Sequence, residues 1–187
     1  MWREKAHDGL RVAKPDKAVE HYLDLGRKCL EDYYDAHYPF DRTTVIETER
    51  FIKFKVSSGG RVFDFCGVLD RLDRNTKEDI WEIHDYKTSS VLPDQEEVDQ
   101  DLQLALYHLA VLSERPEARK VKLVWHYLAF NRDIESRRDA EALAELQKKI
   151  VARIVELEAC RDFPPAKGEL CPWCGYQPVC PEFGREP

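Results

Sequence analysis

The fold is decided by two stretches of sequence, RVFDFCGVLDRL at residues 61–72 and IWEIHDY at residues 80–86. Both are rich in β-branched and aromatic residues and are bounded by polar turns, so each predicts a β-strand. The segment 43–56 has the same character, and SSGG at residues 57–60 is a turn signal between it and residues 61–72. We therefore predict a hairpin of two strands, with the third strand following the polar turn at residues 75–79.

Helical and strand patterns continue through the rest of the chain. Apolar residues recur at three- and four-residue steps in three segments, which is typical of amphipathic helices. We predict helices over residues 16–36, 95–113 and 140–160, and further strands over residues 121–130 and around Ile134. This order of elements predicts an α/β fold with a mixed central sheet flanked by helices. We expect one domain over residues 1–187, in which residues 163–187 form a Cys-rich C-terminal appendix.

The composition is that of a folded protein with a well-charged surface. Of the 187 residues, 43% are hydrophobic and 35% are charged, which is unlike a disordered chain. The 29 Lys and Arg residues against 36 Asp and Glu residues give a net charge of −7, which excludes binding to nucleic acid by overall charge but not an enzyme that acts on it. No apolar run is long enough to span a membrane and no signal-peptide core is visible, so we expect a cytoplasmic protein without a membrane partner.

Two carboxylates and an amine stand at the ends of the second and third predicted strands. Asp70 lies near the end of the second strand, and Asp85 and Lys87 end the third. Residues two apart in a strand point to the same face, so Asp85 and Lys87 share a face, and Asp70 lies close to them if the strands are neighbours. Two carboxylates and a backbone carbonyl suit Mg²⁺ or Mn²⁺, which would activate a water that Lys87 orients. The alternative is a set of ordinary ion pairs at strand ends, which contribute little to stability.

Gln103 and Tyr107 add polar groups from the next predicted helix. They are four residues apart and therefore share a helix face, with Gln100 one turn earlier. Because the opposite face of this helix is apolar, the polar stripe is expected to project over the cation site and to contact a substrate.

Three thiols gather in the tail, at Cys171, Cys174 and Cys180. The other three cysteines are scattered singly along the chain. In a reducing compartment, a C-x2-C pair with a third cysteine nearby indicates a set of metal or iron–sulfur ligands rather than a disulfide framework. Zinc, which prefers tetrahedral sites with sulfur ligands, and an unoccupied thiol loop are the alternatives to iron–sulfur.

The chain resembles the RecB-like nucleases of the PD-(D/E)XK superfamily. The resemblance rests on GVLDRLD at residues 67–73, DYKT at residues 85–88 and QLALY at residues 103–107. It implies a restriction-endonuclease-like fold with helices on both faces of a mixed central sheet. The roles it implies are divalent-cation ligands for Asp70 and Asp85, the catalytic lysine for Lys87, and DNA contact and support of the site for Gln103 and Tyr107.

The tail resembles the iron–sulfur end of AddB-type and CRISPR-associated members of that family. The similarity covers FPP at residues 163–165 and C-x2-C-x5-C-P at residues 171–181. It implies a structural 4Fe–4S cluster, which needs four thiolates. The family's fourth thiolate comes from an N-terminal segment that is missing here, and Cys160, Cys29 and Cys66 are the candidates to replace it, with Cys160 the nearest in sequence. The family's metal-site histidine is the last residue of a Gly-x-x-x-His signature that is missing here. Of the two early histidines, His7 and His21, His21 is the better stand-in, but we favour the interpretation that it is a partly exposed helix residue.

The function that follows from this resemblance is a metal-dependent deoxyribonuclease. We expect an exonuclease that hydrolyses phosphodiester bonds at single-stranded DNA ends, in recombination, repair or CRISPR adaptation. Its expected partners are DNA and either a helicase or CRISPR adaptation proteins. The alternative is a catalytically impaired, nuclease-like module that binds DNA or a helicase, and a chain that is a fragment of a longer polypeptide would fit that alternative.

Overall fold

A single five-stranded mixed sheet forms the centre of the protein. The computed structural model describes residues 17–183. The strands are β1 (Thr44–Ser58), β2 (Arg61–Asn75), β3 (Ile80–Lys87), β4 (Val121–Tyr127) and β5 (Arg132–Ser136), in the spatial order β1-β2-β3-β4-β5. Only the β3–β4 pair is parallel; the other neighbours are antiparallel. The predicted α/β class and mixed sheet are therefore confirmed, as is the hairpin of the first two strands.

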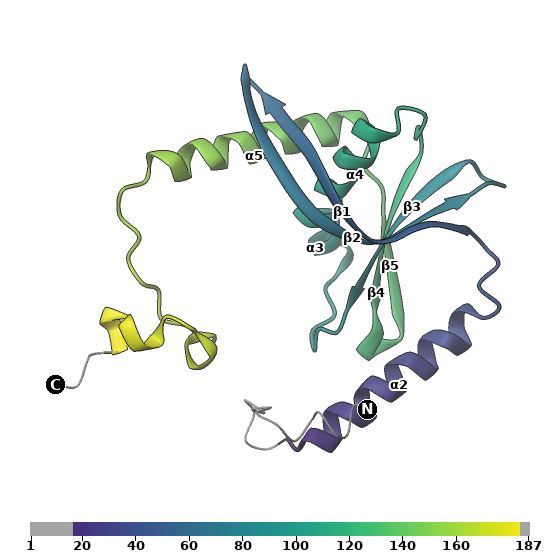
Figure 1. The fold of residues 1–187 in the computed structure, drawn as a ribbon, viewed down its shortest axis with the longest axis horizontal. Coiled ribbons are helices and arrows are strands. Elements are labelled where there is room, and N and C mark those ends of the chain that lie inside the picture. The colour runs from purple at the N-terminus through teal and green to yellow at the C-terminus, as the bar shows by residue number, and fades with distance from the viewer. Residues whose placement is uncertain (1–16, 184–187) are drawn as a thin grey trace.

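Helices cover the two faces of this sheet unequally (Figure 1). They are α2 (Val19–His37), α3 (Gln95–Asp99), α4 (Leu102–Glu114) and α5 (Ala140–Ala159). Helices α4 and α5 pack against strands β1 to β4, whereas α2 contacts the short 3-10 turn Leu128–Phe130 that follows β4. No helix in the described part of the chain is both long enough and apolar enough to cross a membrane.

The prediction of one continuous helix over residues 95–113 is wrong. The chain forms two helices there, and an aspartate caps each of them. Asp94 forms a capping box with Glu97 at the start of α3, and the Asp101 side chain accepts a hydrogen bond from the Leu104 amide, 3.1 Å away, at the start of α4. Both caps satisfy amide groups that lack a partner within the helix, so the second cap starts a new helix rather than continuing the first.

Strand β3 is the central strand and is buried on both faces. All six residues from Ile80 to Asp85 are buried. Ile83 and Trp81 join the apolar core under α4 and α5, together with Trp125 of β4. The next residues in the alternation, His84 and Tyr86, point to the other face of the sheet. This strand therefore carries side chains into two separate interiors.

Asp73 of β2 ties three segments of the sheet together. Its fully buried carboxylate accepts hydrogen bonds from Thr43 Oγ1 at 2.6 Å and from Arg71 Nη2 at 2.9 Å, and it lies 3.4 Å from His84 Nε2 of β3. Burial alone would raise the pKa of Asp73. The groups that donate to it outweigh burial and lower the pKa to about 2. The charged carboxylate is therefore favoured in the folded protein.

Gly67 of β2 lets helix α4 approach the sheet closely. A Cβ atom at this position would lie 2.8 Å from Cε1 and 3.2 Å from the hydroxyl of Tyr107. Only a residue without a side chain therefore leaves room for the Tyr107 ring against the β2 backbone.

The first prediction concerns Asp73 and pH. The pKa of Asp73 falls from the usual 3.8 to about 2 on folding, so its contribution is complete above pH 4 and is lost as pH falls towards 2. Asp73→Asn should lower the free energy of unfolding at pH 7 by about 2 kcal/mol. Urea unfolding followed by circular dichroism at pH 7, 4 and 2.5 should show the difference from wild type shrinking at the lowest pH.

Asp64→Asn is the matched control, because Asp64 lies on the same strand with its side chain exposed and paired to Lys55. It should change stability by less than about 0.5 kcal/mol. A difference between wild type and Asp73→Asn that stays constant down to pH 2.5 would contradict the assigned role of Asp73.

The second prediction concerns the contact between Gly67 and Tyr107. Gly67→Ala should destabilise the protein by about 2 kcal/mol, because the Tyr107 ring must shift out of a packed position. Gly26→Ala on α2 is the control, since a Cβ atom there meets nothing within 4 Å. That substitution should stabilise the helix by up to about 1 kcal/mol. Equal effects of both substitutions on the melting temperature would argue against the close contact.

Candidate active site

The candidate site lies where strands β2 and β3 separate. Their ladder pairs Arg71 with His84, and continuing this register by one residue would place Asp70 opposite Asp85. The ladder ends before that pair. Instead, the Asp70 side chain accepts a hydrogen bond from the Tyr86 amide, with Oδ2 3.0 Å from the nitrogen. A carboxylate thus takes the place of a backbone acceptor. Strand β2 continues to Asn75, so Asp70 lies within this strand and not near its end as predicted, whereas Asp85 lies near the end of β3.

Asp85 is a buried carboxylate beside a cation. Its side chain is almost fully buried, and Oδ2 lies 2.7 Å from Lys87 Nζ in an ion pair that does not have the angle of a hydrogen bond. Burial raises the pKa of Asp85; the charge of Lys87 opposes this shift, and the negative charges of Asp70 and Asp101 add to it. A crowded, desolvated carboxylate of this kind is stabilised by any cation that approaches it.

Lys87 is held between a strand and a helix. Its Nζ donates a hydrogen bond to Gln103 Oε1 of α4 at 2.8 Å, in addition to its ion pair with Asp85. Burial lowers the pKa of Lys87, but the attraction of the Asp85 carboxylate outweighs burial and the pKa is raised. The side chain is therefore a cation at neutral pH with a defined position.

The structure brings together most of the residues that the sequence singled out. Asp70, Asp85, Lys87 and Gln103 are linked by the contacts above, and Tyr107 packs on Gly67 three residues before Asp70. Gln100 forms its hydrogen bond with Glu96 instead and is not linked to Lys87.

Asp101 is a neighbour that the sequence analysis missed. It caps α4, and its negative charge raises the pKa of both Asp85 and Lys87. We overlooked it because a single helix was expected across this position. An aspartate just before the apolar run that starts at Leu102 is an N-cap signal that could have revealed it.

These residues suit a divalent cation. Asp85 Oδ2 is a buried oxygen without a hydrogen-bond partner, and two further carboxylates influence its charge. Oxygen-rich sets of this kind bind Mg²⁺ or Mn²⁺, with water completing the coordination. Within residues 17–183, however, no three carboxylate or imidazole donors gather within 4.8 Å of one another at this place. Protein ligands here therefore number fewer than the cation needs.

His21, the stand-in for a metal-site histidine, is not part of this site. It is exposed on α2, and its ring contacts Tyr22. His7 lies outside the described residues. The sequence alone gave no reason to single out the histidine that α2 does carry to the sheet, His37, which is considered below.

The thiols of the tail do not converge in the described structure. Cys171, Cys174 and Cys180 are free, and their sulfur atoms do not form a group within 4.8 Å. Cys160 is exposed, and its Sγ donates a hydrogen bond to the Asp162 carbonyl at 3.0 Å. Figure 1 shows this segment extending away from the sheet after α5. The structure therefore gives the predicted iron–sulfur cluster no support, and the cluster stays a prediction.

Cys66 is exposed on β2, although a single cysteine within a strand is more often a small buried residue. It lies on the outer side of the β1–β2 hairpin, where the alternation of the strand leaves no element to cover it.

Comparison with known proteins identifies the family of this chain. No curated protein matches the chain. Of the solved structures, 22 chains match it, and one of them, described as "Crystal structure of SSO0001", has 19% sequence identity and a TM-score of 0.40, over 89% of this chain and 73% of that one. A family model for the PD-(D/E)XK nuclease superfamily matches residues 2–181, which is nearly the whole sequence, and the chain therefore belongs to the PD-(D/E)XK nuclease superfamily.

Proposed function

We propose that the protein is a metal-dependent deoxyribonuclease that acts on single-stranded DNA ends in recombination, repair or CRISPR adaptation. Members of its superfamily are nucleases that use divalent cations such as Mg²⁺ or Mn²⁺. The observation that carries the proposal is the buried Asp85 carboxylate, paired with Lys87 and next to Asp70 where two strands separate.

Asp70 and Asp85 are the proposed ligands of the cation. When bound, such a cation lowers the pKa of water and offsets the negative charge of a phosphodiester under attack. Asp70 is oriented for this role by the Tyr86 amide, and Asp85 by Lys87. Asp101 adds negative charge to the same place and therefore strengthens the attraction for a cation.

Lys87 acts as a fixed positive charge. Because its pKa is raised, the ammonium is not a base at neutral pH. It is instead suited to orient a water molecule by hydrogen bonding and to stabilise negative charge that develops on the phosphate oxygens. Gln103 holds the ammonium from the helix side, so Gln103 is a positioning residue.

DNA binding at this site does not need a basic protein. The net charge of −7 would repel DNA, but Lys87 and a bound divalent cation would offset the negative charge of Asp70, Asp85 and Asp101 at the site itself. A helicase or CRISPR adaptation partner is proposed to bring the DNA strand to the site. The preference for single-stranded ends rests on the resemblance of the sequence to RecB-like nucleases.

The third prediction tests the active site. With end-labelled single- and double-stranded DNA and Mg²⁺ or Mn²⁺, wild type should shorten the single strand from its end. Asp85→Asn and Lys87→Met should each lower the rate by at least about a hundredfold, because each removes a charge on which the reaction depends.

Lys53→Met provides the control, because Lys53 is an exposed lysine on β1. It should leave the rate within a factor of two or three of wild type. Cleavage that survives Asp85→Asn would refute the assigned site. Binding of single-stranded DNA without cleavage by any variant would favour a nuclease-like binding module instead.

The fourth prediction tests the positioning of Lys87. Gln103→Met keeps the helix but removes the acceptor of the Lys87 hydrogen bond, so the rate should fall by about tenfold, which corresponds to one hydrogen bond to a charged group. Gln100→Met, one turn earlier, removes only a contact with Glu96 and should have little effect. A double variant with Lys87→Met should be no slower than Lys87→Met alone, and an additive loss would show that Gln103 acts separately.

A further inference from the structure

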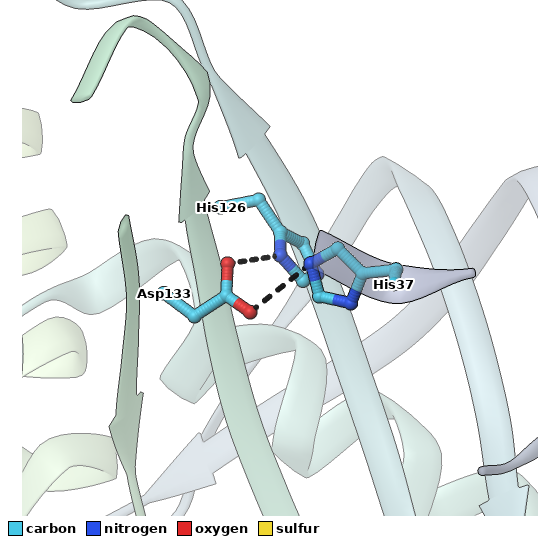
Figure 2. Close-up of side chains that lie close together, drawn as sticks. All are labelled: His37, His126 and Asp133. Atoms are coloured by element: carbon cyan, nitrogen blue, oxygen red, sulfur yellow. Dashed lines mark hydrogen bonds and ion pairs between the residues drawn. The ribbon is translucent and has the colours of Figure 1, made fainter. Parts of the chain in front are cut away.

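A second polar cluster lies on the face of the sheet opposite α4. It consists of His37 at the end of α2, His126 of β4 and Asp133 of β5, and Figure 2 shows both imidazoles turned toward the Asp133 carboxylate. His126 alternates with Trp125 and Tyr127 along β4, which join the apolar core on the other side. The cluster is therefore separated from the candidate active site by the sheet itself.

The three side chains offer one ligand atom each within 4.8 Å of the others. His126 Nδ1 lies 2.6 Å from Asp133 Oδ1, and His37 Nε2 lies 3.3 Å from Asp133 Oδ2. Ligand atoms of a tetrahedral zinc site stand about 3.3 Å apart, given metal–ligand bonds near 2.0 Å. The distance between His37 and Asp133 already fits this value. The distance between His126 and Asp133 is shorter, but the Asp133 side chain is partly exposed at the sheet edge and can move to lengthen it.

A buried chain of hydrogen-bonding groups continues from this cluster. His126 Nε2 lies 2.9 Å from His84 Nδ1, with the two ring planes 7° apart, and His84 Nε2 faces Asp73 Oδ2 at 3.4 Å. His84 is 5% exposed, and its Nε2 has no hydrogen-bond partner. The chain thus runs Asp73, His84, His126, Asp133, with a carboxylate at each end.

His84 can act as the second hydrogen-bond partner of a metal-bound His126. With a metal ion at His126 Nδ1, His126 Nε2–H would donate to His84 Nδ1, and His84 Nε2–H would point toward Asp73 Oδ2. Metal-bound histidines are commonly held by such second hydrogen bonds.

We propose that His37, His126 and Asp133 bind a divalent transition metal such as Zn²⁺, separate from the cation of the nuclease site. Two imidazoles and one carboxylate favour a borderline metal over Mg²⁺. The three residues line a cavity of about 230 Å³, from which water can complete the coordination.

The metal would act as a structural clamp on α2. Of the residues of this helix only Cys29 is buried, so apolar packing holds it weakly. A metal that joins His37 to β4 and β5 would fasten the end of α2 to the sheet. Metal binding would therefore raise the melting temperature of the folded protein.

The experiment is a Zn²⁺ titration of the full chain after removal of metals with a chelator. Stoichiometry and affinity are measured by competition with a chromophoric chelator, and the melting temperature by circular dichroism. His37→Gln and Asp133→Asn should each lose one equivalent of bound Zn²⁺, or bind it at least about tenfold more weakly, and should lose the Zn²⁺-dependent rise in melting temperature.

His21→Gln is the matched control, since it removes an exposed histidine from the same helix. The tail thiols and the nuclease carboxylates are unchanged in both His21→Gln and His37→Gln. Zn²⁺ bound to these groups is therefore the same in the two variants and does not contribute to the difference between them. Identical Zn²⁺ binding and melting by His37→Gln and His21→Gln would overturn the proposal, as would a wild-type protein whose melting temperature does not respond to Zn²⁺. Circular dichroism without metal verifies that both variants fold.

Discussion

The burial of β3 on both faces is the constraint on which the rest of the structure depends. A strand between two neighbours and under cover on each side has no direction in which a polar side chain can reach water. Three of its buried residues are nonetheless ionisable. Glu82 pairs with Lys122 at 3.0 Å, His84 meets His126, and Asp85 meets Lys87. Each partner comes from β3 itself or from the parallel strand β4, which explains why polar groups concentrate around these two strands.

Strand alternation then divides the polar groups into two interiors. One face receives Asp85 and Lys87 beneath α4, and the other receives Glu82, His84 and Tyr86. Each face contains a buried carboxylate beside one permanent cation, Lys87 for Asp85 and Arg71 for Asp73. The outcomes differ because the surroundings differ. Asp73 accepts several hydrogen bonds and its pKa falls, whereas burial, together with the charges of Asp70 and Asp101, raises the pKa of Asp85.

The carboxylate that remains incompletely satisfied is the one expected to react or to bind. A fully hydrogen-bonded carboxylate such as Asp73 stabilises the sheet, and its oxygens are not available to bind a ligand. Asp85 keeps an oxygen without a hydrogen-bond partner in a desolvated place. The same reasoning applies on the opposite face, where the unpartnered nitrogen of His84 marks the chain that ends at Asp133. Both candidate sites therefore stand where the structure leaves a buried polar group unsatisfied.

The sequence by itself determined the strands, their hairpin, the mixed sheet and the pairing of Asp85 with Lys87, because these follow from local composition and from the two-residue period of a strand. The sequence did not determine the break before α4 that brings Asp101 to the site, because the helical pattern of apolar residues continues past Asp101 and only a single capping residue indicates the break. Nor did it indicate the group of His37, His126 and Asp133, whose members come from three elements and share no spacing. The sequence also did not show that the tail thiols lie apart, because the spacing of cysteines along a loop does not determine the distances between their sulfur atoms. Only tertiary structure decides such cases, since it alone sets which side chains from distant segments meet in one desolvated place.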